Sequence, residues 1–355
     1  MDENSQLAIK VSPSYFRTLT RDKSEDFFSG RIGKLKNDLF DILGVSFPAL
    51  QILFDEEMSG EQFSIQVGKS FEIIAGLKAN QLLTKSTREK LDEIKVSAEK
   101  DHYLRDGDYF ITQVTQKNTL NAAGQDSWDG FEYILLNLGE QMKKHCTTFI
   151  TSEKIQADLE KIRESFPQLV ETIYDQHLVE KTTELLRALV SEGISVRNLK
   201  DILQSVLDSD FIKVDGGKNI ILDERVAMYH RPWTGSVNDL LKFTRNSLRS
   251  QVSYQFAPTG TMNVMLLDPE IETLLCTSYA ETIDVEIVEK IIEETRLGFE
   301  DWPKGSDPIV LTTDETRPLF HDLVKESFPN LIVLAYTELE SYLSITTLSR
   351  ISIKR

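Results

Sequence analysis

Apolar residues recur at helical spacing through the centre of the chain, from Phe166 to Leu207. Charged residues such as Glu180 and Arg187 lie between them and would face water. Gly193 is suited to close a first helix in the left-handed conformation, and Ser195 is a good N-cap for a second helix. The pattern therefore predicts a helix pair packed into a larger body, with one apolar stripe of Leu178, Leu185, Leu186, Leu189 and Val190 and another of Val196, Leu199, Ile202, Leu203, Val206 and Leu207.

The N-terminal part of the chain alternates between strand-like and helix-like patterns. Residues 77–108 differ, because they are rich in Lys, Glu and Asp and show only weak apolar periodicity. We expect an inserted, mobile subdomain or a long loop there. The elements expected around it are strands at 7–11, 45–54, 61–67, 70–76 and 109–111, and helices at 24–43, 127–146 and 152–164.

The C-terminal part begins with a predicted hairpin at 211–223, whose tip is Asp215-Gly216-Gly217. Helices and strands then alternate, which predicts an α/β body with at least partly parallel strands. The expected helices are 238–256, 271–279, 285–297 and 315–327, and the expected strands are 262–267, 308–312 and 331–336, with a final extended segment at 343–353.

These elements predict an α+β fold of several subdomains. Residues 1–76 and 109–150 would form a small α/β body, into which 77–108 is inserted. A helical subdomain would span 151–240 and carry the extra hairpin, and a C-terminal α/β subdomain would span 241–355.

Composition narrows the function classes. The chain has 355 residues, with 57 Asp and Glu against 40 Lys and Arg, and a net charge of −17. This charge opposes binding to nucleic acid or to anionic lipid. The sequence contains no run of 18 apolar residues and no secretory signal at its start, so we expect a soluble, cytoplasmic protein. Cys146 and Cys276 are far apart in sequence, which favours two reduced thiols.

Candidate chemistry is sparse. The string from Asp215 to Lys218 lacks the spacing of a phosphate loop, and a hairpin tip explains it better. The histidines are scattered, and apart from the neighbouring His145 and Cys146 none lies within metal-ligand spacing of another His or Cys. No Ser-His-Asp or Cys-His constellation has local support, because neighbours on a helix such as His145 and Cys146 point in different directions. We therefore expect no catalysis, no cofactor and no metal, with an α/β enzyme without a recognisable motif as an alternative.

A helix pair followed by a Gly-Gly hairpin is also typical of a winged helix. In that interpretation residues 195–207 form the recognition helix and expose Arg197, Asn198 and Lys200, but also Asp201. These few cations would neutralise few phosphates. An acidic winged-helix regulator remains the second alternative.

The same central stretch resembles the export-gate proteins of type III secretion systems and of the bacterial flagellum. Members of that family have a Phe-Pro-x-Leu-Val opening, which is Phe166-Pro167-Gln168-Leu169-Val170 here, and a Leu-rich helix. The turn that follows, 191–199, reads Ser-Glu-Gly-Ile-Ser-Val-Arg-Asn-Leu and departs from the family at Gly193-Ile194. The resemblance continues in 327–331 and 336–339, before and after the last predicted strand.

The resemblance implies the cytoplasmic domain of an export gate, more like the virulence branch than the flagellar one. Such a domain has four subdomains, forms a ring that is nonameric in secretion-system members, docks chaperone–substrate complexes and gatekeeper proteins, and passes substrates to the export pore. The implied partners also include the stalk of the secretion ATPase complex. Family members carry a membrane region before the soluble part, which is missing here, so the chain would be a soluble fragment or an unusual member.

Two sets of residues are candidates for these interactions. The polar turn of the helix pair would present Glu192, Arg197 and Asn198 to a neighbouring copy, because the Arg fork can hold a carboxylate. For docking, the family motif is an Asp followed three positions later by a bulky apolar residue, shortly before a strand. Asp101 and Leu104 match this spacing, with Tyr109 and Phe110 as the expected aromatic anchors. The alternative is that Tyr109 and Phe110 are core residues of a strand.

Overall fold

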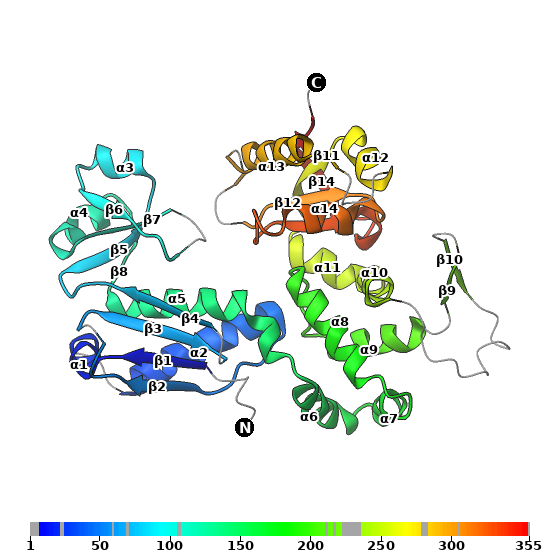
Figure 1. Ribbon diagram of the computed structural model, residues 1–355, viewed down its shortest axis with the longest axis horizontal. Helices are drawn as coiled ribbons and strands as arrows, with labels where there is room; N and C mark the ends of the chain where they lie inside the picture. The colour runs from blue at the N-terminus through cyan, green and yellow to red at the C-terminus, as the bar shows by residue number, and fades with distance from the viewer. Residues whose placement is uncertain are drawn as a thin grey trace. The chain divides into compact units, whose positions relative to one another are not determined.

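The computed structural model divides into two compact units, Met1–Thr151 and Ser152–Arg355, and Figure 1 shows their elements. We refer to them as unit 1 and unit 2. The structure describes residues 7–21, 25–58, 60–68, 71–104, 108–209, 212–215, 218–221, 236–277, 283–300, 302–303 and 306–353.

Unit 1 contains a four-stranded sheet in the order β2-β1-β3-β4. Strand β1 (Leu7–Val11) runs parallel to β2 (Leu50–Phe54) and antiparallel to β3 (Gln62–Val67), which pairs antiparallel with β4 (Phe71–Gly76). Helices α1 (Pro13–Thr20), α2 (Glu25–Leu43) and α5 (Gly130–Lys144) pack against it (Figure 1). Strand β2 begins at Leu50, five residues later than the sequence predicted.

Two helix starts in unit 1 differ from the sequence prediction. Helix α1 was not expected, although Ser12 caps it by accepting the Tyr15 N–H and Pro13 occupies its first turn. Helix α5 begins at Gly130 and not at 127, because the Asp129 carboxylate accepts the N–H groups of Phe131 and Glu132, at 2.9 and 3.0 Å. The two residues before Asp129, Ser127–Trp128, form strand β8 instead.

A second antiparallel sheet of unit 1 has the order β6-β7-β5-β8. It contains β5 (Gln81–Lys85), β6 (Ala98–Lys100) and β7 (Tyr109–Gln113), with α3 (Arg88–Glu93), η2 (Val114–Gln116) and α4 (Lys117–Ala122) beside them. Residues 77–108 therefore hold paired strands and a helix in their described part. Because β7 pairs with β5 and β6, the subdomain boundary that we expected at 108/109 falls inside this sheet.

Unit 2 begins with helices. The first is α6 (Ser152–Arg163), which follows η3 (Cys146–Phe149) of unit 1. The stretch expected to hold a helix pair contains three helices, α7 (Pro167–Asp175), α8 (Val179–Ser191) and α9 (Leu199–Asp208). The N-cap of α9 is Asn198 and not Ser195, since the Asn198 side chain accepts the Asp201 N–H. The expected helix at 238–256 is two helices, α10 (Val237–Ser247) and α11 (Arg249–Phe256).

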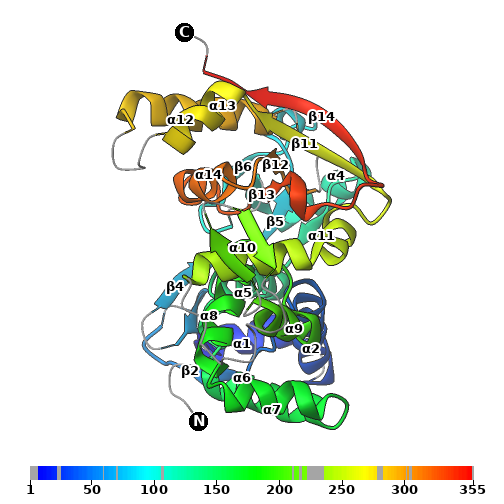
Figure 2. The ribbon, with the colours of Figure 1, turned by 90° about the vertical axis from the view of Figure 1, so that its right-hand side faces the viewer.

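A four-stranded parallel sheet completes unit 2, in the order β13-β12-β11-β14. Its strands are β11 (Thr261–Leu267), β12 (Ile309–Thr312), β13 (Ile332–Ala335) and β14 (Ser344–Ile351), and β11 and β14 lie side by side in Figure 2. Its helices are α12 (Pro269–Thr277), α13 (Val285–Glu300), α14 (Thr316–Val324) and η6 (Tyr336–Glu338). The parallel strands and the mixed α+β fold confirm the sequence prediction.

The expected hairpin lies partly outside the described residues. Strands β9 (Ile212–Asp215) and β10 (Lys218–Ile221) pair antiparallel, whereas 210–211, 216–217 and 222–235 are not described. The two cysteines are free thiols; Cys146 is buried and Cys276 is exposed.

Candidate functional site

The turn between α8 and α9 carries the first set of candidate residues and is tied to helix α11. Gly193 has a φ of +78°, a conformation that L side chains rarely adopt. The Ser195 N–H donates to Gln255 Oε1 at 3.1 Å, while Gln255 Nε2 donates to the Gly193 carbonyl and Gln251 Nε2 to the Ser195 carbonyl, both at 2.7 Å. Two glutamine side chains therefore satisfy the backbone groups of this turn.

A buried cluster of charges adjoins the turn. Arg245, on α10, has a fully buried side chain and donates from Nε and Nη2 to the two oxygens of Glu338, each at 2.7 Å. Its Nη1 donates to Glu192 at 2.7 Å, and its Nη2 also reaches the Val333 carbonyl at 3.1 Å. One guanidinium thus joins the C-terminus of helix α8, helix α10, strand β13 and η6, using the two-pronged geometry that favours Arg over Lys.

Helix α14 adds a second cation to this cluster. Arg317 Nη1 lies 2.8 Å from Glu192 Oε2, and its Nε lies 3.5 Å from Glu338 Oε1. His321, one turn further along α14, places Nδ1 4.0 Å from Glu192 Oε1. We call Glu192, Arg245, Arg317, His321 and Glu338 the buried charge cluster.

The charges of the two arginines and two glutamates cancel. Burial alone would lower the pKa of Arg245, but the charges and hydrogen bonds of Glu338 and then of Glu192 outweigh it and raise that pKa above its ordinary value. The pKa of His321 is lowered below its ordinary value of 6.5. Burial is the largest cause, and it outweighs the attraction of Glu192, which would raise this pKa. The cluster is therefore balanced with a neutral His321, and it joins the helical part of unit 2 to the α/β part.

The structure corrects the role expected for Glu192. Its side chain is 9% exposed and is held by both arginines, so it does not face a neighbouring copy. Asn198 caps α9 and donates to Asp201 at 2.6 Å, which gives it a structural role. Arg197 is exposed and stays a predicted interface residue.

The second set of candidate residues is buried as well. The Asp101 carboxylate, 3% exposed, accepts the Tyr133 hydroxyl at 2.7 Å and the backbone N–H groups of Tyr103 and Leu104 at 3.1 and 2.8 Å. Its partners fix the loop before β7 against helix α5. Burial is the largest cause that raises the pKa of Tyr133, followed by its hydrogen bond to Asp101, so the phenol stays protonated and donates.

The neighbouring side chains are buried, which favours the alternative that Tyr109 and Phe110 are core residues of a strand. Leu104, Tyr109 and Phe110 are 6%, 8% and 4% exposed. Phe110 packs with Leu91, Val96 and Leu120 in the core of the second sheet of unit 1, and Tyr109 lies against Trp128. Removing Asp101 and Leu104 together would therefore destabilise unit 1. The exposed aromatic side chain of this segment is Tyr103, at 46%.

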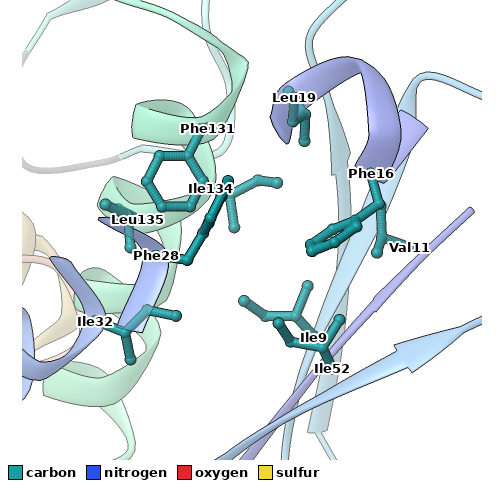
Figure 3. A pocket seen from close by; sticks show the side chains of 10 residues that line it. All are labelled: Ile9, Val11, Phe16, Leu19, Phe28, Ile32, Ile52, Phe131, Ile134 and Leu135. Atoms are coloured by element: carbon teal, nitrogen blue, oxygen red, sulfur yellow. The ribbon is translucent and has the colours of Figure 1, made fainter. Parts of the chain in front are cut away.

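Sequence reasoning missed Arg245, Arg317, His321 and Glu338. These residues have no local signal, because they come together from segments that are far apart along the chain. It also missed an apolar hollow in unit 1 between α1, α2, α5 and the edge of the first sheet, which Figure 3 shows.

Neither a metal-binding cluster nor a membrane-spanning helix is found in the part of the chain that the structure describes. No group of three or more His, Cys, Asp or Glu side chains is arranged to hold a metal ion there. Within the same ranges, no helix is both long enough and apolar enough to cross a membrane.

The fold is that of a known class of protein. The chain is similar in structure to Chlamydia pneumoniae CdsV, solved alone and in a complex with CdsO, at 21% identity and a TM-score of 0.79; the first comparison covers 99% of this chain and 98% of that one. It is also similar to nonameric EPEC SctV-C, at 15% identity and a TM-score of 0.72, over 99% of each chain. These likenesses show the fold: that of the export-gate domains of type III secretion.

The model of the FHIPEP family matches residues 2–344, so the chain belongs to the FHIPEP family. Among curated relatives, the low calcium response locus protein D of Yersinia pestis is 22% identical over 331 residues, which cover 90% of this chain and 44% of that protein. The chain thus spans less than half of the length of this relative. The resemblance to the export-gate family is confirmed, and it favours that prediction over the enzyme and the winged-helix regulator.

Proposed function

We propose that this chain is the cytoplasmic, ring-forming domain of a type III secretion export gate. In this role it docks chaperone–substrate complexes and gatekeeper proteins at the inner membrane and hands substrates to the export pore. The observation that carries the proposal is the family match over residues 2–344, together with a fold shared over 99% of the chain with a nonameric domain. A stalk protein of the secretion ATPase complex is a further proposed partner, which the family resemblance implies, and the similar protein CdsV has been solved in a complex with another protein, CdsO.

Ring formation is the part of the proposal that is most directly tested. Each copy carries a charge of −17, so self-repulsion opposes assembly and salt should favour it by screening. We expect light scattering and electron microscopy to show rings at high protein concentration, and more of them as salt increases. A strict monomer under all of these conditions, and also when fused to a membrane anchor, would rule out a ring.

Arg197 is the proposed contact of that ring within the α8–α9 turn. Arg197→Glu should reduce assembly, because it reverses the charge of an exposed side chain at the proposed contact. Arg296→Glu is the matched control, since Arg296 is an exposed arginine of α13 that pairs with Glu293 on its own helix. Equal assembly of both variants would show that the turn is not at the interface.

Tyr103 is the proposed docking residue, because it is exposed whereas Asp101 and Leu104 are buried. Tyr103 is exposed beside the buried Asp101, and aromatic side chains are common anchors of protein interfaces. Tyr103→Ala should weaken binding of a chaperone–substrate complex from the same secretion system, as measured by calorimetry. Tyr342→Ala, which changes a 70% exposed tyrosine of unit 2, should leave the affinity unchanged. Equal affinities for wild type and both variants would contradict docking at this position.

We also propose that the chain has no catalytic activity of its own. The proposal rests on a sequence without a phosphate loop or a catalytic triad. Stoichiometric hydrolysis of a nucleotide by the purified chain, retained after gel filtration, would contradict it.

A further inference from the structure

The apolar hollow in unit 1 lies beside the edge of the first sheet. It is a small, partly open space, and the side chains that face it in Figure 3 are all apolar. The sheet, helix α1 and helix α5 supply its main walls, through Ile9, Val11 and Ile52, through Phe16, and through Phe131 and Ile134. Ile52, which lines the hollow, is 38% exposed, and Phe54, whose ring contacts that of Phe16, is 59% exposed. Burying exposed apolar side chains lowers the free energy of the system. Binding of a partner that covers them is therefore favoured.

Strand β2 forms one border of this hollow and is an edge strand. It pairs with β1 on one side, and no described strand pairs with its other side. Natural edge strands usually carry Lys, Pro or a bulge that prevents pairing with another chain. The five residues of β2, Leu-Gln-Ile-Leu-Phe, contain neither Lys nor Pro, and their register against β1 is regular.

The side chains of β2 point to alternate faces of the sheet. Ile52 faces the hollow, and Phe54, on the same face, lies with its ring edge-on to Phe16 at 5.3 Å. A strand added to β2 would continue this alternation. Its own apolar side chains on that face would then extend over Ile52 and Phe54 and into the hollow.

Three carboxylates follow β2 directly, at Asp55, Glu56 and Glu57. Glu56 and Glu57 are exposed, and Asp55 accepts the Glu57 N–H at 2.9 Å. None of the ion pairs found among the described residues involves any of the three. This end of the strand therefore attracts a positive charge and repels a second copy of a chain whose net charge is −17.

We propose that the β2 edge and the hollow beside it form a docking site for an extended segment of a partner protein. The segment adds a strand to β2 through main-chain hydrogen bonds, which give affinity without sequence specificity. It places apolar side chains at alternate positions over the hollow, and Lys or Arg at the end that meets residues 55–57. The site lies within unit 1, so it depends neither on ring formation nor on any other part of the proposed function.

The test uses the full chain and fluorescent peptides of about seven residues, the usual length of a short strand. Each peptide alternates valine with threonine and carries two lysines at one end. One version has them at the N-terminus and the other at the C-terminus, so that both strand directions are covered. Fluorescence anisotropy should show saturable binding of one version, and replacing its lysines by glutamates should weaken binding by about tenfold at low salt.

Backbone methylation separates strand addition from other modes of binding. In each of two further peptides, every second peptide nitrogen is methylated, with the side chains unchanged. The set whose N–H groups face β2 should bind about tenfold more weakly or worse, and the other set should bind almost as the parent does. If both bind like the parent, the segment is not held as a strand and the proposal is wrong.

A pair of matched variants tests whether the peptide binds at the β2 edge. Ile52→Asp should weaken binding by about tenfold or more, because it removes apolar surface from the lining of the hollow and adds a charge. Ile74→Asp is the control, since Ile74 is 52% exposed on β4, the opposite edge of the same sheet. Equal affinities of the two variants would overturn the proposal. If Ile52→Asp does not fold, two other measurements test the site: peptide binding to Phe54→Ser, and binding of the methylated peptides to the wild-type protein.

A second copy of the chain is the competing occupant. Sedimentation of the peptide-free protein distinguishes it, because self-association that Ile52→Asp abolishes, without peptide binding to wild type, would assign the edge to copies of this chain. That result, like the absence of any peptide binding, contradicts the proposal.

Discussion

Arg245 links several distant segments of unit 2. Its charge is fully buried and is balanced by Glu338 and Glu192, with the Val333 carbonyl as a further acceptor. Burying such charges is costly, so the cluster adds little net stability compared with apolar packing, but a charge left alone in it is strongly destabilising.

Arg245→Met should therefore destabilise the protein by about 3–5 kcal/mol, because it leaves two carboxylates with fewer partners in a buried site. Chemical denaturation measures the free energy of unfolding. Lys242→Met, on the same helix, is the control, since Lys242 is 37% exposed and lies 3.8 Å from Glu315. An equal loss in the two variants would contradict the importance of the cluster.

His321 gives the cluster a predicted dependence on pH. Because burial lowers its pKa in the folded state, the unfolded chain takes up a proton near pH 6.5 while the folded chain does not. The free energy of unfolding should then be independent of this group above that pH and should fall as the pH decreases through it. The neighbouring charges of Glu192, Arg317, Asp322 and Arg245 act on the same imidazole.

The measurement compares wild type with His321→Gln between about pH 8 and about pH 5.5. The variant should lose stability less steeply at the acid end. His145 of unit 1, whose pKa burial also lowers, contributes equally to both proteins and cancels in the difference. Parallel curves for the two proteins would show that His321 does not titrate differently on folding.

At the scale of elements, the α8–α9 turn depends on a glycine for two reasons. A Cβ at Gly193 would be in the left-handed conformation and would lie 2.6 Å from Cδ1 of Ile332 on β13. At Gly260 the φ is +80°, but no atom lies within 4 Å of the added Cβ. The two glycines therefore separate the backbone effect from the steric one.

Gly260→Ala should cost about 1–2 kcal/mol from the backbone alone, and Gly193→Ala should cost more. Adding Ile332→Val, which removes the clashing methyl group, should recover part of the loss at Gly193 but none at Gly260. Thermal and chemical denaturation of these variants gives the comparison. Equal losses at both glycines would mean that Ile332 moves aside without cost.

At the scale of the whole molecule, the chain is built from two units with cores of their own. The second sheet of unit 1 closes over Leu91, Val96, Phe110 and Leu120. In unit 2, Met265, Ile291, Val310 and Phe320 belong to the core of the parallel sheet. The buried charge cluster also lies wholly in unit 2.

Residues 1–151 and 152–355 should therefore each fold as a separate polypeptide, with a cooperative unfolding transition. Circular dichroism and NMR spectra of the two pieces check this. In the intact chain, Arg245→Met should shift only the transition assigned to 152–355. A piece that unfolds without cooperativity, or a shift of both transitions, would show that the units stabilise each other.

The sequence by itself determined the features that depend on near neighbours along the chain. Apolar periodicity gave the α+β order and the parallel C-terminal sheet, because side chains three or four residues apart share a helix face and every second one shares a strand face. A run of matching residues around 166–170 and 191–199 was enough to indicate the family. Helix ends were less accurate, since Asp129 and Asn198 compete for capping with equally suitable neighbours.

Only the tertiary structure decided which polar side chains are buried. Glu192 appeared to be a surface residue because its partners, Arg245 and Arg317, follow 53 and 125 residues later. Asp101 appeared to be a docking residue because Tyr133 lies 32 residues away. Charged side chains usually face water, and they are buried only where distant segments supply opposite charges or hydrogen bonds. That pairing is set by the packing of the whole unit, which no local pattern contains.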